Sequence, residues 1–442
     1  MSNQPSQRIA IIGGGPIGVE AALYGAIAGF DVHLFERGEV ADNVRRWGFV
    51  QVFTEWGRNR SPLAARLLRE QGEILPPGEE YSSGDELAAY VQKLSLLPPL
   101  RGRIHTQTEA ISLTLERCLK SDFLDSDGLY GLAQRADFSF RLHLKNEQRE
   151  WIEHFEVVLD ATGVYHAPNY MGSGGVPCLG ERQLAAQIDY ALPDISGRER
   201  HRFSGKHTLV VGSGHSAAST LLAIADLIEE NPDTRLTWIV RRNVPLHGAP
   251  YTLLENDTST TRARLHKAAN ALIAHPNVTF LPRTVVQEIA QENGAFKVLL
   301  DCNDERKIVS CDNIAAHTGF RADDALWREL QVAVHPATGA PLKLGVELNA
   351  HNARSGIGLS TGYAEQQVQD EEVKQQARDR WSYLINDPAL LQTGEANFYV
   401  LGIKSYGRDA GFLMHNGFRQ VRDVWKLISG NETLNLYGDE LK

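Results

Sequence analysis

The sequence predicts an α/β fold made of two similar units, each a parallel sheet covered by helices. The prediction rests first on the order of apolar strand, glycine-rich turn and helix in IAIIGGGPIGVEAA, near the N-terminus. The same order returns in the middle of the chain, in TLVVGSGHSAAST. A chain of 442 residues, 42% of them hydrophobic, is also long enough for roughly two or three domains with buried cores.

The first glycine-rich turn follows the β-branched run Ile9 to Ile12, which is typical of a buried parallel strand. Gly13 permits a tight turn, Gly15 lets a pyrophosphate approach the backbone, and Gly18 lets the next helix pack closely on the strand. The pyrophosphate would then lie at the positive N-terminus of that helix. The spacing predicts a dinucleotide site, and we expect cofactor contacts from Gly13, Gly14, Gly15, Pro16, Ile17 and Gly18.

An acidic residue completes this first unit. Glu36 ends a second apolar strand, Val32 to Phe35, and lies about twenty residues beyond the turn, where its carboxylate can accept hydrogen bonds from ribose hydroxyls. A 2′-phosphate would be repelled there, so the site suits FAD or NAD. The neighbouring Arg37 is included among the expected cofactor contacts.

The second glycine-rich turn ends differently. Its strand partner, Leu236 to Val240, runs into Arg241 and Arg242, and two guanidinium groups suit a 2′-phosphate. We therefore expect NADPH at this turn, with a solvated basic strand end as the alternative interpretation. The expected contacts also include Gly212, Ser213, Gly214, His215, Ser216 and Ala217.

Three further segments extend the pattern. VVLDATG contains Thr162 and Gly163, DNIAAHTGF contains Thr318 and Gly319, and NFYVLGIKSYGRDAGFLMHNG contains Gly402. With the two turns, the order of these elements resembles that of the two-dinucleotide-binding-domain flavoproteins. The resemblance implies an FAD domain in two parts, residues 1–169 and 335–442, with an NAD(P)H domain between them at residues 170–334.

The resemblance also implies flavin contacts. Those expected at the FAD site are Arg45, Trp47, Gly48, Ala110, Thr162, Gly163, Gly402 and Phe412. Trp47 and Trp56 could equally be anchors of the core. Lys404 and Arg408 could supply positive charge beside the flavin, with a solvated loop as the alternative. His415 could relay a proton or be an ordinary core histidine, and Asn416 could also face the ring. The sequence assigns no catalytic side chain, and Arg408, His415 and Lys404 are only candidates for that role.

The cysteines exclude one kind of flavoprotein chemistry. Cys118, Cys178, Cys302 and Cys311 are scattered, without the spacing of a redox dithiol or of a zinc site. We expect all four to be small buried hydrophobic residues, and we predict no metal site.

The reaction is less well specified. RRWGF, at Arg45 to Phe49, resembles the flavin loop of flavin-containing monooxygenases, although the FxGxxxH fingerprint of that family is missing. GVPCLGE, before the second turn, is similar to thioredoxin-reductase-like flavoproteins such as bacillithiol-disulfide reductase. Those proteins carry one cysteine in the first turn, where Ile17 stands here.

These resemblances imply an FAD oxidoreductase reduced by NADPH, with O2 as acceptor. It would oxygenate a small amine or sulfur substrate through a C4a-hydroperoxyflavin. The alternatives are a reductase of a disulfide, quinone or other small electrophile, and a protein that binds nucleotides without catalysis.

Charge and hydropathy limit the partners. The formal net charge is −10 and no basic stripe occurs, so we expect a small-molecule substrate and no nucleic acid. No apolar run is long enough for a membrane span, and the N-terminus enters the first strand without a secretory signal pattern. We expect a cytoplasmic protein, with a homodimer as the default oligomer.

Overall fold

The computed structural model describes residues 7–122, 135–242, 250–251, 260–354 and 387–441. The chain divides into two compact units, the first made of Met1–Val164 with Arg321–Lys442 and the second of Tyr165–Phe320. The predicted α/β fold with a discontinuous first domain is confirmed.

The boundaries were predicted after residues 169 and 334, whereas in the structure the second unit begins at Tyr165 and ends at Phe320. Residues 321–334 belong to the first unit because Trp327 and Leu330 are buried in the same cluster as Phe140 and Phe398. The predicted return of the chain lies later, at residue 335, because no pattern in the sequence indicates this packing.

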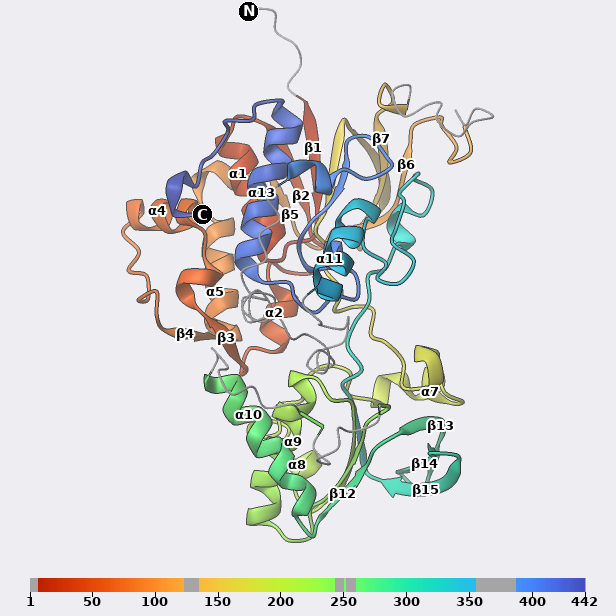
Figure 1. The fold of residues 1–442 in the computed structure, drawn as a ribbon. Coiled ribbons are helices and arrows are strands. Elements are labelled where there is room, and N and C mark those ends of the chain that lie inside the picture. The colour runs from red at the N-terminus through yellow and green to blue at the C-terminus, as the bar shows by residue number, and fades with distance from the viewer. Residues whose placement is uncertain (1–6, 123–134, 243–249, 252–259, 355–386, 442) are drawn as a thin grey trace, which may run out of the picture. The chain divides into compact units, whose positions relative to one another are not determined.

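In the described part of the first unit, a parallel sheet has the order β17-β9-β1-β2-β5. Figure 1 labels β1, β2 and β5 of this sheet. Its strands are β1 (Arg8–Ile12), β2 (Asp31–Phe35), β5 (Ile104–His105), β9 (Val157–Asp160) and β17 (Phe398–Val400). An antiparallel sheet contains β6 (Glu109–Leu115), β7 (Phe140–Lys145) and β8 (Glu150–Phe155), and a ribbon pairs β3 (Gln51–Glu55) with β4 (Tyr81–Ser83).

Helices of the first unit include α1 (Pro16–Ile27), α2 (Asp42–Arg46), α3 (Trp56–Asn59), α4 (Pro62–Glu70), α5 (Gly84–Ser95), α11 (Leu342–Arg354) and α13 (Met414–Ser429). Short 3-10 turns occur at Pro98–Leu100, Ala325–Trp327, Pro388–Leu391, Gly402–Tyr406 and Gly438–Glu440. Helix α5 begins at a capping box of Ser83 and Glu86, in which each side chain bonds the other residue's backbone N–H.

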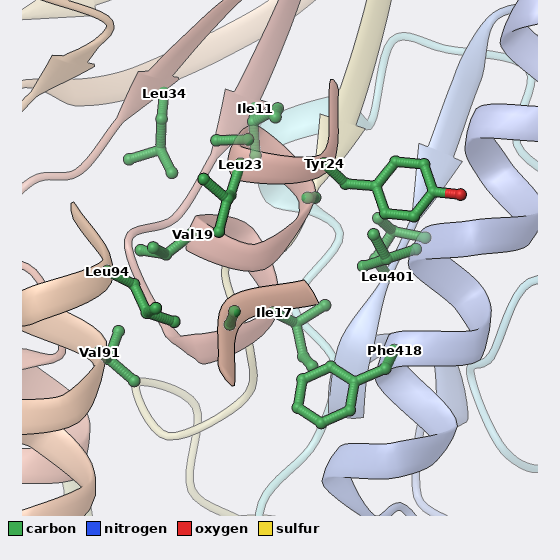
Figure 2. Close-up of a cluster of buried hydrophobic side chains, with 14 of the residues drawn as sticks. Ile11, Ile17, Val19, Leu23, Tyr24, Leu34, Val91, Leu94, Leu401 and Phe418 are labelled. Carbon is green, nitrogen blue, oxygen red and sulfur yellow. The ribbon is translucent and has the colours of Figure 1, made fainter. Parts of the chain in front are cut away.

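The core of this unit packs α1, α5 and α13 on one face of the parallel sheet. Figure 2 shows Ile11 and Leu34 of the sheet, Val19 and Leu23 of α1, Val91 and Leu94 of α5, and Phe418 of α13 in this cluster. The other face packs on the antiparallel sheet, with Ile12 and Phe35 meeting Leu113 and Leu142. The unit is therefore three-layered, and the loops after the parallel strands meet at one sheet edge.

The described part of the second unit repeats the plan with a parallel sheet of order β12-β11-β10-β16. Its elements are β10 (His207–Val211), β11 (Arg235–Ile239), β12 (Val278–Leu281), β16 (Asn313–Ala316), the antiparallel strands β13 (Thr284–Glu292), β14 (Ala295–Cys302) and β15 (Glu305–Cys311), and the helices α7 (Glu181–Leu184), α8 (Arg200–Phe203), α9 (His215–Glu230) and α10 (Thr260–Ala271). Its 3-10 turns are Ser173–Gly175, Ala185–Gln187 and Leu272–Ala274.

Candidate functional site

The first glycine-rich turn joins β1 to α1. Gly13 has a φ of 108°, and a Cβ there would lie 2.6 Å from the carbonyl oxygen of Ala161. A Cβ on Gly18 would lie 1.9 Å from the Gly13 carbonyl oxygen. A Cβ on Gly15, in contrast, would meet no described atom within 4 Å, and Gly15 begins α1 without a side-chain cap. The backbone thus requires glycine at two positions, and at Gly15 it is open to an incoming phosphate.

The Glu36 carboxylate lies against this turn. It accepts hydrogen bonds from the backbone N–H of Gly14 at 2.6 Å and of Gly38 at 2.8 Å. The Glu36 carbonyl accepts from Thr108 N–H at 2.9 Å, which brings the start of β6, including the half-buried Ala110, towards the end of β2. Arg37 is exposed. The structure therefore places Gly14 and Thr108 against Glu36, with Ala110 two residues beyond Thr108.

Ile17 connects the first turn of α1 to the C-terminal segment. A Cβ on Gly417 of α13 would lie 2.3 Å from Ile17 Cδ1, and a Cβ on Gly402 would lie 3.5 Å from Ile17 Cβ. Phe412 belongs to the same group, since its ring meets the Tyr406 ring edge to face at 5.3 Å. Predicted contacts from the two ends of the sequence are therefore neighbours.

A hydrogen-bond network that the sequence analysis missed holds the Gly402–Tyr406 turn on α13. Gly402 N–H donates to Gln420 Oε1 at 2.8 Å, and Gln420 Nε2 donates to Ser405 Oγ at 2.8 Å. Ser405 Oγ in turn donates to the Gly402 carbonyl at 2.7 Å. All three residues are buried. The network fixes Gly402, whose φ of 70° favours glycine.

Lys404 forms a buried ion pair with Asp160, the last residue of β9. The distance from Lys404 Nζ to Asp160 Oδ2 is 2.6 Å, and the two side chains are 2% and 0% exposed. The solvated-loop alternative for Lys404 is therefore wrong. Nor is its charge isolated, because Asp160 compensates it.

The Asp160 carboxylate is fully hydrogen-bonded. Thr162 donates its N–H and its hydroxyl to Oδ1 at 3.0 and 2.7 Å, and Trp327 Nε1 donates to Oδ2 at 2.8 Å. Burial acts to raise the pKa of Asp160, but the Lys404 ammonium and the Thr162 bonds outweigh it and hold that pKa below its ordinary value. These contacts fix the turn containing Thr162 and Gly163, two of the predicted flavin contacts.

The residues after β2 form a compact loop around α2. Arg45 donates to Asp42 Oδ1 at 2.7 Å and to the Val40 carbonyl at 3.2 Å. Gly48 is buried, and a Cβ there would overlap the carboxylate of Asp85. Among the described residues, the buried indole N–H of Trp47 has no hydrogen-bond partner, so it suits an acceptor on a ligand.

The other aromatic and C-terminal candidates differ in how far they are buried. Trp56 is 4% exposed and packs edge to face on Tyr90 at 5.6 Å, as expected of a core anchor. Arg408 is exposed, whereas His415 is half-buried and Asn416 buried in the first turn of α13. The helix begins after Leu413 without a side-chain cap. Its first N–H groups can therefore face a ligand beside these residues.

The second glycine-rich turn, between β10 and α9, repeats the geometry of the first. Gly212 has a φ of 126°, and a Cβ there would lie 2.3 Å from the carbonyl oxygen of His317. A Cβ on Gly214 would meet no described atom within 4 Å. Two aromatic donors hold the turn: Trp238 Nε1 to the Gly212 carbonyl at 2.9 Å, and Tyr251 Oη to the Gly214 carbonyl at 3.1 Å.

The other residues predicted at this turn lie around it. Arg241 is exposed just beyond β11, whereas Arg242 donates to the Pro250 carbonyl at 3.0 Å. His215, the first residue of α9, stacks on His266 of α10 with ring centroids 5.2 Å apart. Ser213 is half-buried, Ser216 is exposed and Ala217 is buried.

His317 lies directly beneath the second turn, at the place that Ala161 occupies in the first unit. Its Nε2 is 2.7 Å from Thr220 Oγ1, and burial lowers its pKa to about 4, so the ring is neutral at pH 7. The neighbouring Thr318 donates its hydroxyl to the Asn169 carbonyl at 2.5 Å, and Gly319 has a φ of 81°. The sequence analysis named Thr318 and Gly319 and missed His317.

The cysteines carry no dithiol. All four are free thiols. Cys118, Cys178 and Cys311 are buried, but Cys302 is partly exposed, which corrects the expectation for that residue. Burial raises the pKa of Cys178 and of Cys311 to about 12 in each case. A thiolate nucleophile at these two positions is therefore disfavoured at neutral pH.

The described ranges contain no candidate metal site and no candidate membrane span. No group of three or more His, Cys, Asp or Glu side chains there could hold a metal ion. None of the helices in those ranges combines the length and apolar character of a membrane span.

Each Rossmann-like unit thus has a glycine-rich turn between a strand and a helix, and the chain has the fold of the two-dinucleotide-binding-domain flavoproteins. It is similar to bacillithiol disulfide reductase from Bacillus cereus, with a TM-score of 0.63, 15% identity and coverage of 96% of this chain and 99% of that one. It is also similar to the cadaverine monooxygenase of desferrioxamine biosynthesis from Erwinia amylovora, with a TM-score of 0.60, 11% identity and coverage of 98% of this chain and 96% of that one. For ornithine N-hydroxylase from Kutzneria sp. 744 the TM-score is 0.57 and the identity 13%, with coverage of 97% of this chain and 100% of that one. No protein-family model and no curated protein sequence matches the chain.

Proposed function

We propose that this chain is an FAD-dependent oxidoreductase reduced by NADPH. The observation that carries the proposal is the pair of glycine-rich turns, each open at Gly15 or Gly214 and each followed by a helix without a side-chain cap. Dinucleotide phosphates fit helix N-termini of this kind. Two of the similar structures, the cadaverine monooxygenase and the ornithine N-hydroxylase, contain FAD, and the latter also contains NADP+.

The residue at the end of the second strand in each unit supports a different nucleotide at each turn. Glu36, which accepts the Gly14 N–H, presents a carboxylate that suits ribose hydroxyls and repels a 2′-phosphate, which supports FAD in the first unit. Arg241, exposed beyond β11, suits the 2′-phosphate of NADPH in the second. FAD, when bound, accepts a hydride from NADPH and passes electrons to an acceptor.

For the second half-reaction we propose oxygenation of a small amine or sulfur substrate. The position in the first turn that carries a cysteine in bacillithiol-disulfide-reductase-like proteins is Ile17, enclosed here by Gly402 and Gly417. The four cysteines are unpaired thiols. Without a thiol at the turn or a dithiol, O2 is the acceptor that requires the fewest side chains, and the similar N-hydroxylase and cadaverine monooxygenase share this architecture.

A reductase acting directly from the flavin on a disulfide, quinone or other small electrophile is the second candidate. The fold match to the Bacillus cereus reductase, with a TM-score of 0.63 over 96% of this chain, favours it. Such a reaction also needs no cysteine of this chain.

A rapid-mixing experiment separates these candidates. The FAD-loaded protein is reduced anaerobically with NADPH and then mixed with oxygenated buffer containing an amine or a thioether. A transient absorbance near ~370–390 nm before flavin reoxidation, followed by an oxygenated product, supports the monooxygenase. Direct reoxidation of the flavin that releases stoichiometric peroxide with every candidate substrate rejects the monooxygenase and favours the reductase. If NADPH does not bleach bound FAD, the result supports the remaining alternative, a nucleotide-binding protein without catalysis.

A further inference from the structure

Tyr251 lies on the inner side of the second glycine-rich turn. Its side chain is 5% exposed, and its hydroxyl donates to the Gly214 carbonyl at 3.1 Å. The same carbonyl accepts the Ala218 N–H at 3.1 Å in the first turn of α9. Burial raises the pKa of Tyr251, so the hydroxyl keeps the proton that it donates.

Residues outside the turn hold Tyr251 in this position. Asn270 of α10 accepts the Tyr251 N–H at 3.1 Å and donates to the Tyr251 carbonyl at 2.7 Å, while Arg242 donates to the preceding Pro250 carbonyl. The Tyr251 ring stacks on His266, with ring centroids 4.5 Å apart, and lies nearly parallel to the Trp238 ring at 5.8 Å. The backbone of Tyr251 is thus fixed to one helix and its hydroxyl to another.

We infer that Tyr251 is a positioning residue for nucleotide binding at the second turn, with Asn270 as its anchor. By holding the Gly214 carbonyl inward, the Tyr251 hydroxyl fixes the peptide groups of the turn, so that their N–H groups and the uncapped start of α9 are ready for the phosphates of NADPH. Binding then costs less ordering of the turn. The inference rests on the proposed function and adds to it a residue that no nucleotide fingerprint contains.

Among the described residues, the first glycine-rich turn has no side-chain donor comparable to the Tyr251 hydroxyl. There the carbonyl of Gly14 accepts the backbone N–H of Ala41 at 3.0 Å, and Glu36 holds the Gly14 N–H. The turn is fixed by its own strand-end segment, without a side chain brought from a distant helix. Removal of the Tyr251 hydroxyl should therefore affect NADPH and leave FAD unchanged.

The test compares Tyr251→Phe with Tyr190→Phe in the FAD-loaded full chain. Tyr190 is a matched control in the same unit, because its hydroxyl donates to Glu181 at 2.9 Å, at a contact that does not include the glycine-rich turn. Calorimetric titration with NADP+ and the KM for NADPH in anaerobic flavin reduction are measured for each. We expect Tyr251→Phe to raise the Kd and KM roughly threefold to tenfold, the effect of one hydrogen bond. The reduction rate at saturating NADPH and the FAD content should stay unchanged.

Asn270→Ala tests the anchor in a double-mutant cycle. Because both changes act through the same contact with Gly214, the effect of the double variant on the NADP+ Kd should be smaller than the product of the two single effects. Melting temperatures without NADP+ show whether each variant is folded, and Asn270→Asp, which keeps the acceptor for Tyr251 N–H, should have a smaller effect than Asn270→Ala.

The outcomes are distinguishable. If unaltered protein binds no NADP+, the proposed function fails and the inference fails with it. If unaltered protein binds NADP+ and Tyr251→Phe binds it equally well, the inference alone is overturned. A fall in the saturated reduction rate with unchanged KM, or a loss of FAD, would also overturn it.

Discussion

The substitution Lys404→Met would leave the Asp160 carboxylate buried without a cation. Removing one partner of a buried ion pair costs about 3–5 kcal/mol, because the remaining charge is neither hydrated nor neutralised. Asp160 would keep the donors of Thr162 and Trp327, so we expect a loss near the lower end of that range. Replacing both partners, as Asp160→Asn with Lys404→Met, should recover most of the loss.

The pH dependence of stability should also change sign. With Lys404 present, the pKa of Asp160 is below its unfolded value, so its contribution is present above that value and is lost as the pH falls through the folded pKa. In Lys404→Met, burial acts without the ammonium and raises the pKa of Asp160. The stability contribution of Asp160 is then present at low pH and is lost as the pH rises through the raised pKa of Asp160.

Urea unfolding followed by circular dichroism between pH 4 and pH 8 measures the loss of stability and the new pH dependence of Lys404→Met. In the unaltered protein Asp160 contributes a constant stability over this range, because the range lies above its unfolded pKa of 3.8. A chain of two compact units can unfold in two steps, so the comparison uses the midpoint and slope of the transition that moves. Lys93→Met is the control, because Lys93 pairs with Glu73 with both side chains at least one-third exposed, and such pairs contribute ~0–1 kcal/mol. A loss for Lys404→Met no larger than for Lys93→Met, or an unaltered pH dependence, would refute the reasoning.

Three further outcomes are expected. Burial raises the pKa of Glu20 from 4.5 to about 7, so stability is lost as the pH rises through that interval; Glu20→Gln should remove this loss of about 3 kcal/mol in urea unfolding. Arg241→Ala should weaken NADPH by ~1–3 kcal/mol while sparing NADH in parallel titrations, and equal losses would contradict a 2′-phosphate contact. Gly15→Ala should lower FAD affinity and Gly214→Ala NADPH affinity, each about tenfold or more. Neither should lower the apo melting temperature, since a Cβ at either position meets no described atom within 4 Å. A variant that unfolds instead would show that the glycine is structural.

The sequence was sufficient for the turns because their requirements are local. Gly13 and Gly212 need a positive φ, and each faces the carbonyl of a residue that precedes a Thr-Gly pair, Ala161 or His317. Strand, glycine, helix and Thr-Gly motif all follow at short spacings that can be read without coordinates. The unit boundary differs from the predicted one because residues 321–334 pack through Trp327, a contact that no local pattern indicates.

The missed contacts join residues that are far apart in the sequence. Lys404 and Asp160 are 244 positions apart, and nothing near Lys404 in the sequence indicates that its ammonium would be buried. Tyr251 reaches Gly214 across 37 positions and depends on Asn270 for its place. A charged residue at the end of a buried strand, as in VVLD, was the one available signal for the first pair. Its partner depends on tertiary packing, which spacing does not encode.

Ile17 relates this packing to the choice of reaction. Its side chain fills the space that two glycines leave, Gly402 in a turn fixed by Gln420 and Gly417 in the first turn of α13. A Cβ on Gly417 would overlap Ile17 Cδ1, so the glycine and the isoleucine fit as a pair. Cysteine at position 17 would lack the δ-methyl group and leave part of that space empty. The two glycines thus match a branched apolar side chain, and this chain's first turn is built for packing rather than for a thiol.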